Sequence, residues 1–313
     1  DGRRRGTTAP SILLLPVEKV SAMTLHGKTA LITGGSGTIG KAIAGAFLKQ
    51  GASLVILTGR KISKLEQAKK DLLLELQKTE DATTYTEGGS TQNGKVDIIS
   101  SDISKEDSVV ELFKQIDQLL MERKQQTAIP DGNKEQVSRK SRCVVGSLDI
   151  LVNNAGINVT GATEELTASD MESVLGVNVV GAFLCAREAM KRMKSNNHQE
   201  GGGRIINIGS ISAKSPRPNS ATYTTSKYAL MGLTQSLALD GRTHGISVGI
   251  IHPGNVVSEL LSPEEIKMRE EQEGFLQAED VADCVVTMAT LPDSANVLEL
   301  TVIPTRQPLI GRG

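Results

Sequence analysis

The alternation of short apolar runs with longer helical stretches is the feature that most restricts how this chain folds. The apolar runs lie at 29–33, 54–58, 96–100, 148–152, 205–208, 246–251 and 297–303. Helical patterns separate them near 38–50, 62–78, 104–122, 179–195, 223–241 and 278–290. Such alternation is typical of a parallel sheet with helices on both faces, and near-continuous apolar strands suit burial on both sides. We therefore predict one α/β domain built on a doubly wound parallel sheet of about seven strands.

Two polar segments, 79–94 and 123–146, interrupt this pattern. Connections in such folds usually run about 2–6 residues, so we interpret both segments as surface insertions. The domain is predicted to span 26–313, and residues 1–25 are predicted to form a disordered tail. Because that tail contains three consecutive arginines and several Ser and Thr, a remnant of an organelle transit peptide is the alternative. The expected location is accordingly the cytoplasm, or an organelle if the segment is such a remnant.

The composition excludes several classes of protein. The chain has 35 basic and 36 acidic residues and only 2% aromatic residues, so nothing favours nucleic acid as a partner. There is no apolar run of 18 residues, and we predict no membrane span. The widely spaced Cys143, Cys185 and Cys284 form neither a disulfide framework nor a metal motif. No metal site is predicted, and a reducing compartment is favoured.

A glycine-rich loop follows the first predicted strand. Gly35, Gly37 and Gly40 form a G-x-G-x-x-G pattern between that strand and the next helix. Glycines in this place allow a tight turn and a close approach of the backbone to a pyrophosphate, which the helix N-terminus attracts. A flexible turn is the alternative. The context favours a dinucleotide site in a Rossmann-type fold.

The end of the second predicted strand bears on which dinucleotide binds. NAD sites usually place an Asp or Glu there for the ribose 2′-hydroxyl, but this chain has Arg60 and Lys61. A guanidinium pairs well with a 2′-phosphate. We therefore expect NADP(H) to be favoured over NAD(H), the alternative being that both cations are ordinary solvated charges.

A tyrosine and a lysine four residues apart suggest proton transfer. On a helix, Tyr223 and Lys227 share one face, and Ser210 ends a strand thirteen residues before the tyrosine. An ammonium beside a phenol favours the phenolate and lowers a pKa that starts near 10. Such a tyrosine can exchange a proton with a substrate oxygen near neutral pH.

Together these motifs resemble the classical short-chain dehydrogenases/reductases over roughly residues 26–304. The matching pieces, in order, are the loop at 34–40, Asp102-Ile103, Asn153-Asn154-Ala155-Gly156, Asn178, Ser210, Tyr223 with Lys227, and Pro253-Gly254. The end of the chain, from Ala278 to Gln307, resembles the branch that contains NADP-dependent 3-hydroxy acid and serine dehydrogenases.

The resemblance implies roles for the matching residues. Tyr223 would be the acid/base, and Lys227 would hold the nicotinamide ribose and lower the tyrosine pKa. Ser210 would hydrogen-bond the substrate oxygen, and Asn178 would hold a water of a proton relay. The cofactor-binding set would be Gly34, Ser36, Gly37, Thr38, Ile39, Gly40, Arg60, Asp102, Ile103, Asn154, Ala155, Gly156, Tyr223, Lys227, Pro253, Gly254 and Val256.

One position departs from the family pattern. The classical loop has a glycine where this chain has Thr38, which puts the geometry around the pyrophosphate in question. Three further features bear on the substrate pocket. Arg217 is either a clamp for a substrate carboxylate or an exposed loop residue, and the charged stretch 259–275 is a substrate lid with a largely solvated face. His252 is expected to be a strand-end residue without a catalytic role.

The sequence thus predicts an NADP(H)-dependent oxidoreductase that interconverts a carbonyl and an alcohol, with Tyr223 as acid/base. The alternative is a non-catalytic Rossmann protein that binds dinucleotide as a sensor or scaffold. The expected partner is a small carbonyl or hydroxy compound. Apolar stripes on the helices near 179–195 and 223–241 predict a homodimer or homotetramer.

Overall fold

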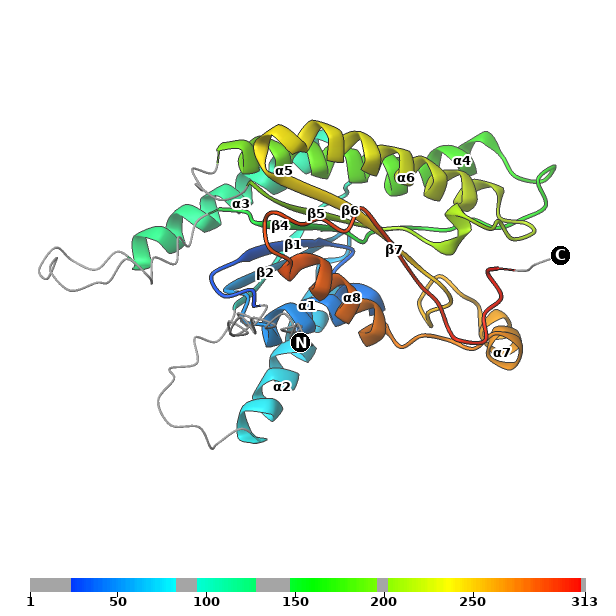
Figure 1. Ribbon diagram of the computed structural model, residues 1–313, viewed down its shortest axis with the longest axis horizontal. Coiled ribbons are helices and arrows are strands. Elements are labelled where there is room, and N and C mark those ends of the chain that lie inside the picture. Colours follow the sequence, from blue (N-terminus) through cyan, green and yellow to red (C-terminus); the bar gives the residue numbers. More distant parts are fainter. Residues whose placement is uncertain (1–23, 83–94, 128–146, 196–201, 311–313) are drawn as a thin grey trace, which may run out of the picture.

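The computed structural model describes residues 24–82, 95–127, 147–195 and 202–310, and these build one parallel sheet (Figure 1). Its seven strands lie in the order β3-β2-β1-β4-β5-β6-β7, and every pair is parallel. They are β1 (Thr29–Thr33), β2 (Leu54–Gly59), β3 (Lys95–Ser100), β4 (Ile150–Asn153), β5 (Gly203–Ile208), β6 (Ile246–Pro253) and β7 (Glu299–Val302). The predicted doubly wound fold is confirmed.

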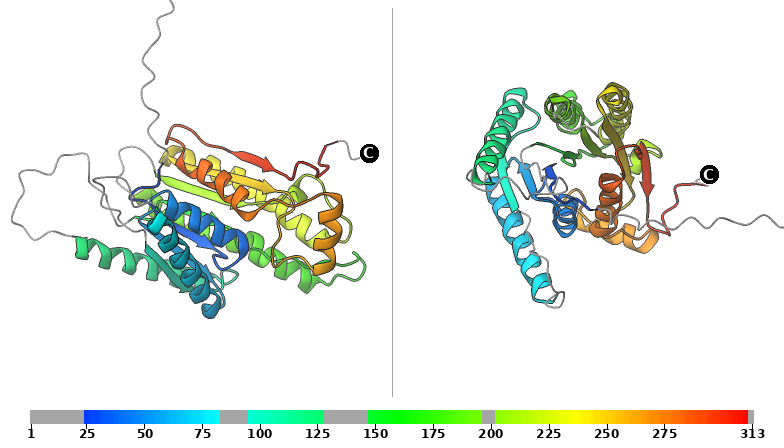
Figure 2. Two further views of the ribbon diagram at one scale, coloured as in Figure 1. Left: turned by 90° about the horizontal axis from the view of Figure 1, so that it is seen from below. Right: turned by 60° about the vertical axis from the view of Figure 1, so that its left-hand side comes forward.

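Helices cover both faces of the sheet (Figures 1 and 2). One layer consists of α1 (Thr38–Lys49), α2 (Ile62–Ala82) and α8 (Ala278–Thr290), and the other of α3 (Glu106–Thr127), α5 (Ala182–Ser195) and α6 (Ala221–Gly241). Each layer buries its own apolar cluster against the strands. Phe47 of α1 is fully buried on one face and Phe113 of α3 on the other. Truncating either ring to alanine is expected to cost about 3–5 kcal/mol of folding free energy.

The predicted boundaries need correction at the tail and the insertions. Leu25 is buried, and its N–H donates a hydrogen bond to the Gln50 carbonyl at 2.8 Å, so the packed domain includes the end of the predicted tail. Helices α2 and α3 continue into the polar sequence and end at Ala82 and Thr127. The first residues of both predicted insertions are therefore helical. The remainders at 83–94 and 128–146, with Cys143, lie outside the described residues, as do residues 1–23.

Two helices and a π-helical turn were not predicted from the sequence. Helix α4 (Ala168–Leu175) begins at a capping box in which Thr167 and Asp170 satisfy each other's backbone N–H groups. A π-helical turn, Gly176–Gly181, joins it to α5. Helix α7 (Pro263–Gln272) lies beyond the carboxyl ends of the strands (Figure 1).

The continuous helical run Ala168–Ser195 satisfies a length and hydropathy criterion for a membrane-crossing helix, with a mean hydropathy of 1.3. More than half of that apolar window, 56%, is buried inside the domain. A buried core helix of this length meets the same criterion, so this helical run is only weak evidence for a membrane span. The expected absence of a membrane span stays a prediction.

The strand order fixes where a ligand can bind. Strands β1 and β4 are neighbours at the centre, and the chain leaves them toward opposite sides of the sheet. In open α/β sheets, ligands bind in the crevice outside the carboxyl ends of the strands at this switch point. The loops after Thr33 and Asn153 form that crevice here.

Candidate active site

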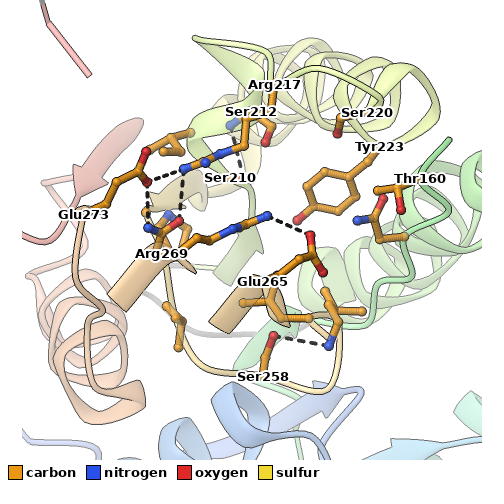
Figure 3. Close-up of a pocket in the computed structure, with 18 of the residues that line it drawn as sticks. Thr160, Ser210, Ser212, Arg217, Ser220, Tyr223, Ser258, Glu265, Arg269 and Glu273 are labelled. Atoms are coloured by element: carbon orange, nitrogen blue, oxygen red, sulfur yellow. Dashed lines mark hydrogen bonds and ion pairs between the residues drawn. The ribbon is translucent and has the colours of Figure 1, made fainter. Parts of the chain in front are cut away.

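Two adjoining cavities open at the carboxyl ends of the strands. The larger, about 730 Å³, is lined by Ser210 and Tyr223 (Figure 3), and the smaller, about 350 Å³, by the glycine loop. Ser258 and Leu260, on the segment after β6, line both. A ligand that fills the smaller cavity can therefore extend past these residues toward Tyr223.

The start of the glycine loop is held tightly against β4. Gly34 has a φ of +63°, and a Cβ there would lie 2.8 Å from the Ala155 Cα. The Asn154 side-chain amide donates to the carbonyl oxygens of Thr33 and Gly34, both at 3.0 Å. Gly40 is the one glycine-loop residue of the predicted cofactor-binding set that does not line either cavity. It lets α1 pack on the loop, since a Cβ would lie 2.5 Å from the Gly34 carbonyl oxygen.

The N-terminus of α1 already holds an anionic group. Thr38 is the first residue of the helix, and its N–H and hydroxyl donate to the Glu259 carboxylate at 3.2 and 3.0 Å. A Cβ at Gly37 would meet no atom nearer than 3.4 Å, so the backbone leaves room for a ligand next to the Glu259 carboxylate. The site therefore fits a pyrophosphate, as helix N-termini generally do. Thr38 keeps its backbone N–H as a donor and adds a hydroxyl, and its effect on cofactor binding stays a prediction.

The smaller cavity also collects three cations. Arg60 and Lys61 line it as expected, and Lys64, on the first turn of α2, joins them. Lys64 was not predicted, although its position four residues after Arg60 could have suggested it. No acidic residue follows β2 directly, and Asp102 lines the same cavity as the three cations.

Most of the other residues that were predicted to bind the cofactor line one of the two cavities. The smaller cavity takes Gly34, Ser36, Gly37, Thr38, Ile39, Asp102, Ile103, Asn154, Ala155 and Gly156. The larger takes Tyr223, Pro253, Gly254 and Val256. Lys227 lines neither and lies behind the tyrosine. Within the described residues, no three His, Cys, Asp or Glu side chains gather as metal ligands.

Ser210 and Tyr223 come together on the wall of the larger cavity. Ser210 caps a short 3-10 turn after β5, and its hydroxyl accepts the Ser212 N–H at 3.1 Å. Tyr223 lies in the first turn of α6, and its phenol lines the same cavity as Ser210, close enough for the serine hydroxyl to act on the tyrosine pKa. Strand β5 and helix α6 thus bring two hydroxyls thirteen residues apart in sequence to one point.

Lys227 lies under the Tyr223 ring, one turn further along α6. Its ammonium is 5.4 Å from the ring centroid and donates to the Ile208 carbonyl at 2.8 Å. Complete burial lowers the pKa of Lys227 to about 8. Burial also raises the pKa of Tyr223, although a hydrogen bond from Ser210 and the charge of Arg269 act in the opposite direction. The expected lowering of the tyrosine pKa is therefore wrong for this structure, because desolvation of the phenolate is the largest effect.

Asn178 is buried within the π-helical turn. Its amide oxygen accepts the Ile157 N–H at 2.8 Å, and its amide nitrogen donates to the Ile157 carbonyl at 3.0 Å and to the Ser226 hydroxyl at 2.9 Å. The side chain ties the loop after β4 to α6, beside Lys227. π-helical turns occur frequently at functional sites. The water-relay role remains a prediction.

His252 supports Ser210 from behind. The imidazole is fully buried in β6, and its Nδ1 lies 2.9 Å from the Ser210 carbonyl oxygen. Burial lowers the pKa of His252, so the ring is neutral at physiological pH. It does not line either cavity. The structure therefore agrees with a strand-end residue that does not contact the substrate.

Four charged side chains line the larger cavity opposite Tyr223 (Figure 3): Arg217, Glu265, Arg269 and Glu273. Arg217 is not an exposed loop residue, because its side chain lines the cavity and its Nη2 donates to Glu273 at 2.6 Å and to the Asn255 amide oxygen at 3.1 Å. The clamp role stays a prediction. The other three lie at 259–275, where a largely solvated face was expected. That expectation is wrong for these residues, because α7 folds over the cavity and turns them inward.

Comparisons with known proteins agree with this geometry. The model for short chain dehydrogenases matches residues 130–269, and the KR domain model matches residues 28–124. Glucose 1-dehydrogenase 2 of Bacillus subtilis is 32% identical over 236 residues, which are 75% of this chain and 74% of that protein.

Two solved structures are similar throughout. A 3-ketoacyl-(acyl-carrier-protein) reductase from Brucella melitensis, complexed with NADH, has 25% identity and a TM-score of 0.70, covering 91% of this chain and all of that one. A metagenomic short-chain oxidoreductase in complex with NADP has 26% identity and a TM-score of 0.65, covering 90% and 98%. The chain belongs to the short-chain dehydrogenase/reductase family and is an oxidoreductase with a Rossmann-type fold. The likeness to the 3-hydroxy acid branch stays a prediction.

Proposed function

We propose that this protein interconverts a carbonyl and an alcohol with NADP(H), and that Tyr223 transfers the proton. The observation that carries the proposal is that two hydroxyls, those of Ser210 and Tyr223, share the wall of a cavity that adjoins the glycine loop. A substrate carbonyl placed between them would meet two O–H donors.

A bound nicotinamide supplies or accepts the hydride in such a reaction. In the reducing direction, the Tyr223 phenol gives its proton to the carbonyl oxygen, while the Ser210 hydroxyl donates a hydrogen bond to that oxygen. Because burial raises the pKa of Tyr223, the phenol is protonated at neutral pH and is a proton donor. The same residues run in reverse for alcohol oxidation, with the phenolate accepting the hydroxyl proton.

Lys227 supports this proton transfer from below the ring. Its ammonium, held by the Ile208 carbonyl, stabilises negative charge that develops on the phenol oxygen. The Lys227 pKa near 8 leaves the ammonium charged at neutral pH.

The preference for NADP(H) is supported by Arg60, Lys61 and Lys64 at the end of the smaller cavity. Three cations at the carboxyl end of β2 can bind a 2′-phosphate, and no carboxylate follows that strand to bind a 2′-hydroxyl instead. A non-catalytic sensor is less well supported, because such a protein has no need of the Ser210–Tyr223 pair and the buried lysine beneath it.

The test is Tyr223→Phe, with Tyr228→Phe as the matched control. Tyr228 lies on the same helix, but its side chain faces outward and is 41% exposed. Turnover of carbonyl probes, followed by NADPH absorbance, should fall at least about 100-fold in Tyr223→Phe while the NADPH Kd stays within about twofold. Turnover that survives in Tyr223→Phe would show that another group transfers the proton.

A further inference from the structure

Arg269 lies on the wall of the larger cavity and points toward Tyr223 (Figure 3). It belongs to the last part of α7, and its side chain is only 16% exposed. The guanidinium donates to Glu265, one turn earlier, with 3.1 Å between Nη2 and Oε1. Its Nε is buried and has no partner among the described residues. A guanidinium carries five N–H donors, so most of the donors of Arg269 remain available.

Two other arginines with largely buried side chains are well satisfied. Arg204 donates to three backbone carbonyls near the end of α8, and Arg192 donates to both oxygens of Asp117 and to the Glu188 carbonyl. These two hold helices in place. Leaving buried donors unpaired costs free energy, and the buried Nε of Arg269 belongs to a guanidinium that faces the candidate substrate. The contrast indicates that a ligand accepts hydrogen bonds from the remaining donors of Arg269.

The neighbouring carboxylates do not occupy the remaining hydrogen-bond donors of Arg269. Burial alone would raise the pKa of Glu273, but hydrogen bonds from Arg217, Asn255 and Gln307 lower it to about 2. That carboxylate is therefore ionised and its charge is compensated within its own cluster. Glu265 is anchored as well, because its second oxygen accepts the Ser262 N–H at 2.9 Å in the capping box of α7. Glu265 thus fixes one edge of Arg269 and leaves the other edge toward the cavity.

We propose that Arg269 binds a carboxylate of the substrate, so that the enzyme acts on oxo acids and hydroxy acids. The planar fork of a guanidinium matches a carboxylate with two parallel hydrogen bonds. Because Arg269 and Tyr223 line the same cavity, the acid group and the reacting carbonyl belong to one small molecule. The inference rests on the proposed function, since it names the substrate class for that site.

The test compares matched acids and esters. The probes are pyruvate, acetoacetate and levulinate, which place the carbonyl two, three or four carbons along the chain, each with its methyl ester. Glyceraldehyde 3-phosphate against glyceraldehyde tests phosphate as the anion. The variants are Arg269→Met and, as a control, Lys267→Met, which removes an exposed cation from the same helix.

Wild type should prefer at least one acid over its ester by about 10-fold or more in kcat/KM. Arg269→Met should lower kcat/KM for that acid by about 10- to 100-fold, mainly through KM, and leave the ester within about threefold. Lys267→Met should change neither. Equal use of acid and ester by wild type, or an equal loss of both in Arg269→Met, would overturn the proposal. A preference for the phosphate probe over every acid would overturn the assignment to carboxylates.

A binding measurement separates this proposal from the proposed function. If no probe is turned over, the carbonyl reductase assignment fails, but the anion site can still be tested by thermal unfolding in the presence of NADP and acetoacetate. A rise in Tm that wild type shows and Arg269→Met lacks would support the carboxylate site without catalysis. The same rise in both proteins, or none in either, would overturn it.

Discussion

The carboxylate of Glu259 sits on the N-terminus of α1, where it accepts hydrogen bonds from the N–H and the hydroxyl of Thr38. These donors are the ones that a dinucleotide pyrophosphate needs. Glu259 follows β6, on the segment whose residues Ser258 and Leu260 line both cavities. A bound pyrophosphate would compete with the Glu259 carboxylate for these donors, so the Glu259 side chain would have to move.

Replacing the competing charge should strengthen cofactor binding. In Glu259→Gln, the NADPH Kd from a fluorescence titration should fall about two- to fivefold, because a charge near a helix N-terminus is worth about 0.3–1 kcal/mol. The effect should shrink as salt is added, since the contact is exposed. Glu271→Gln, which removes an exposed acid from α7, is the control and should leave Kd unchanged. Weaker binding in Glu259→Gln would mean that Glu259 assists the cofactor.

The cations after β2 should determine the cofactor preference. We expect wild type to favour NADPH over NADH by about 10-fold or more in kcat/KM, since a guanidinium–phosphate pair contributes about 1.5–3 kcal/mol. Arg60→Ala should remove most of that preference by raising KM for NADPH while leaving NADH unaffected. Lys70→Ala, on an exposed part of α2 away from the cavity, should change neither. Equal use of both cofactors by wild type would show that the cations are only solvated charges.

The sequence predicted the sheet well because buried parallel strands are nearly continuous apolar runs. Each of the seven predicted runs overlaps an observed strand. Helix α7 was missed because its sequence, PEEIKMREEQ, has no apolar stripe and no buried residue. Its position depends on contacts over the cavity, which periodicity does not report. For α4, the Thr167–Asp170 spacing was a usable signal, since it forms the capping box.

The candidate site was predicted residue by residue, but its electrostatics were not. Family motifs identified Ser210, Tyr223 and Lys227, and the structure brings them together. A spacing of four residues suggested a lowered phenol pKa, yet burial, which sequence does not quantify, raises it. Arg269 also escaped prediction, because a cation in a charged helix has no pattern that distinguishes a cavity wall from a solvated face.

Buried Lys227 should make the stability of the protein depend on pH. Its pKa is lowered from 10.5 to about 8, so between these values the unfolded chain binds more protons than the folded one. The free energy of unfolding contributed by this group therefore rises with pH in that window. Compared with Lys227→Met, wild type should gain about 2 kcal/mol between pH 7 and pH 10, measured by urea unfolding.

In the difference between wild type and Lys227→Met, the contributions of the other titrating groups to the free energy of unfolding cancel. Burial raises the pKa of Cys185 to about 12, which gives both proteins the same loss of stability above pH 9. A difference between the two proteins that stays constant from pH 7 to pH 10 would show that Lys227 keeps its ordinary pKa in the folded state. At pH 7 the variant should be at least as stable as wild type, because it buries no charge.

The outward face of the π-helical turn, α5 and α6 should hold two copies of the chain together. Val180, Phe183, Tyr228 and Leu239 are all exposed there, between 41% and 60%. An apolar face on adjacent helices can pair with itself across a twofold axis. Phe183→Glu should convert a dimer or tetramer into a smaller species in analytical ultracentrifugation, because it places charges opposite each other in the interface. Leu74→Glu, at 47% exposure on α2, should not. A wild type that sediments as a monomer at 50 μM would contradict this prediction.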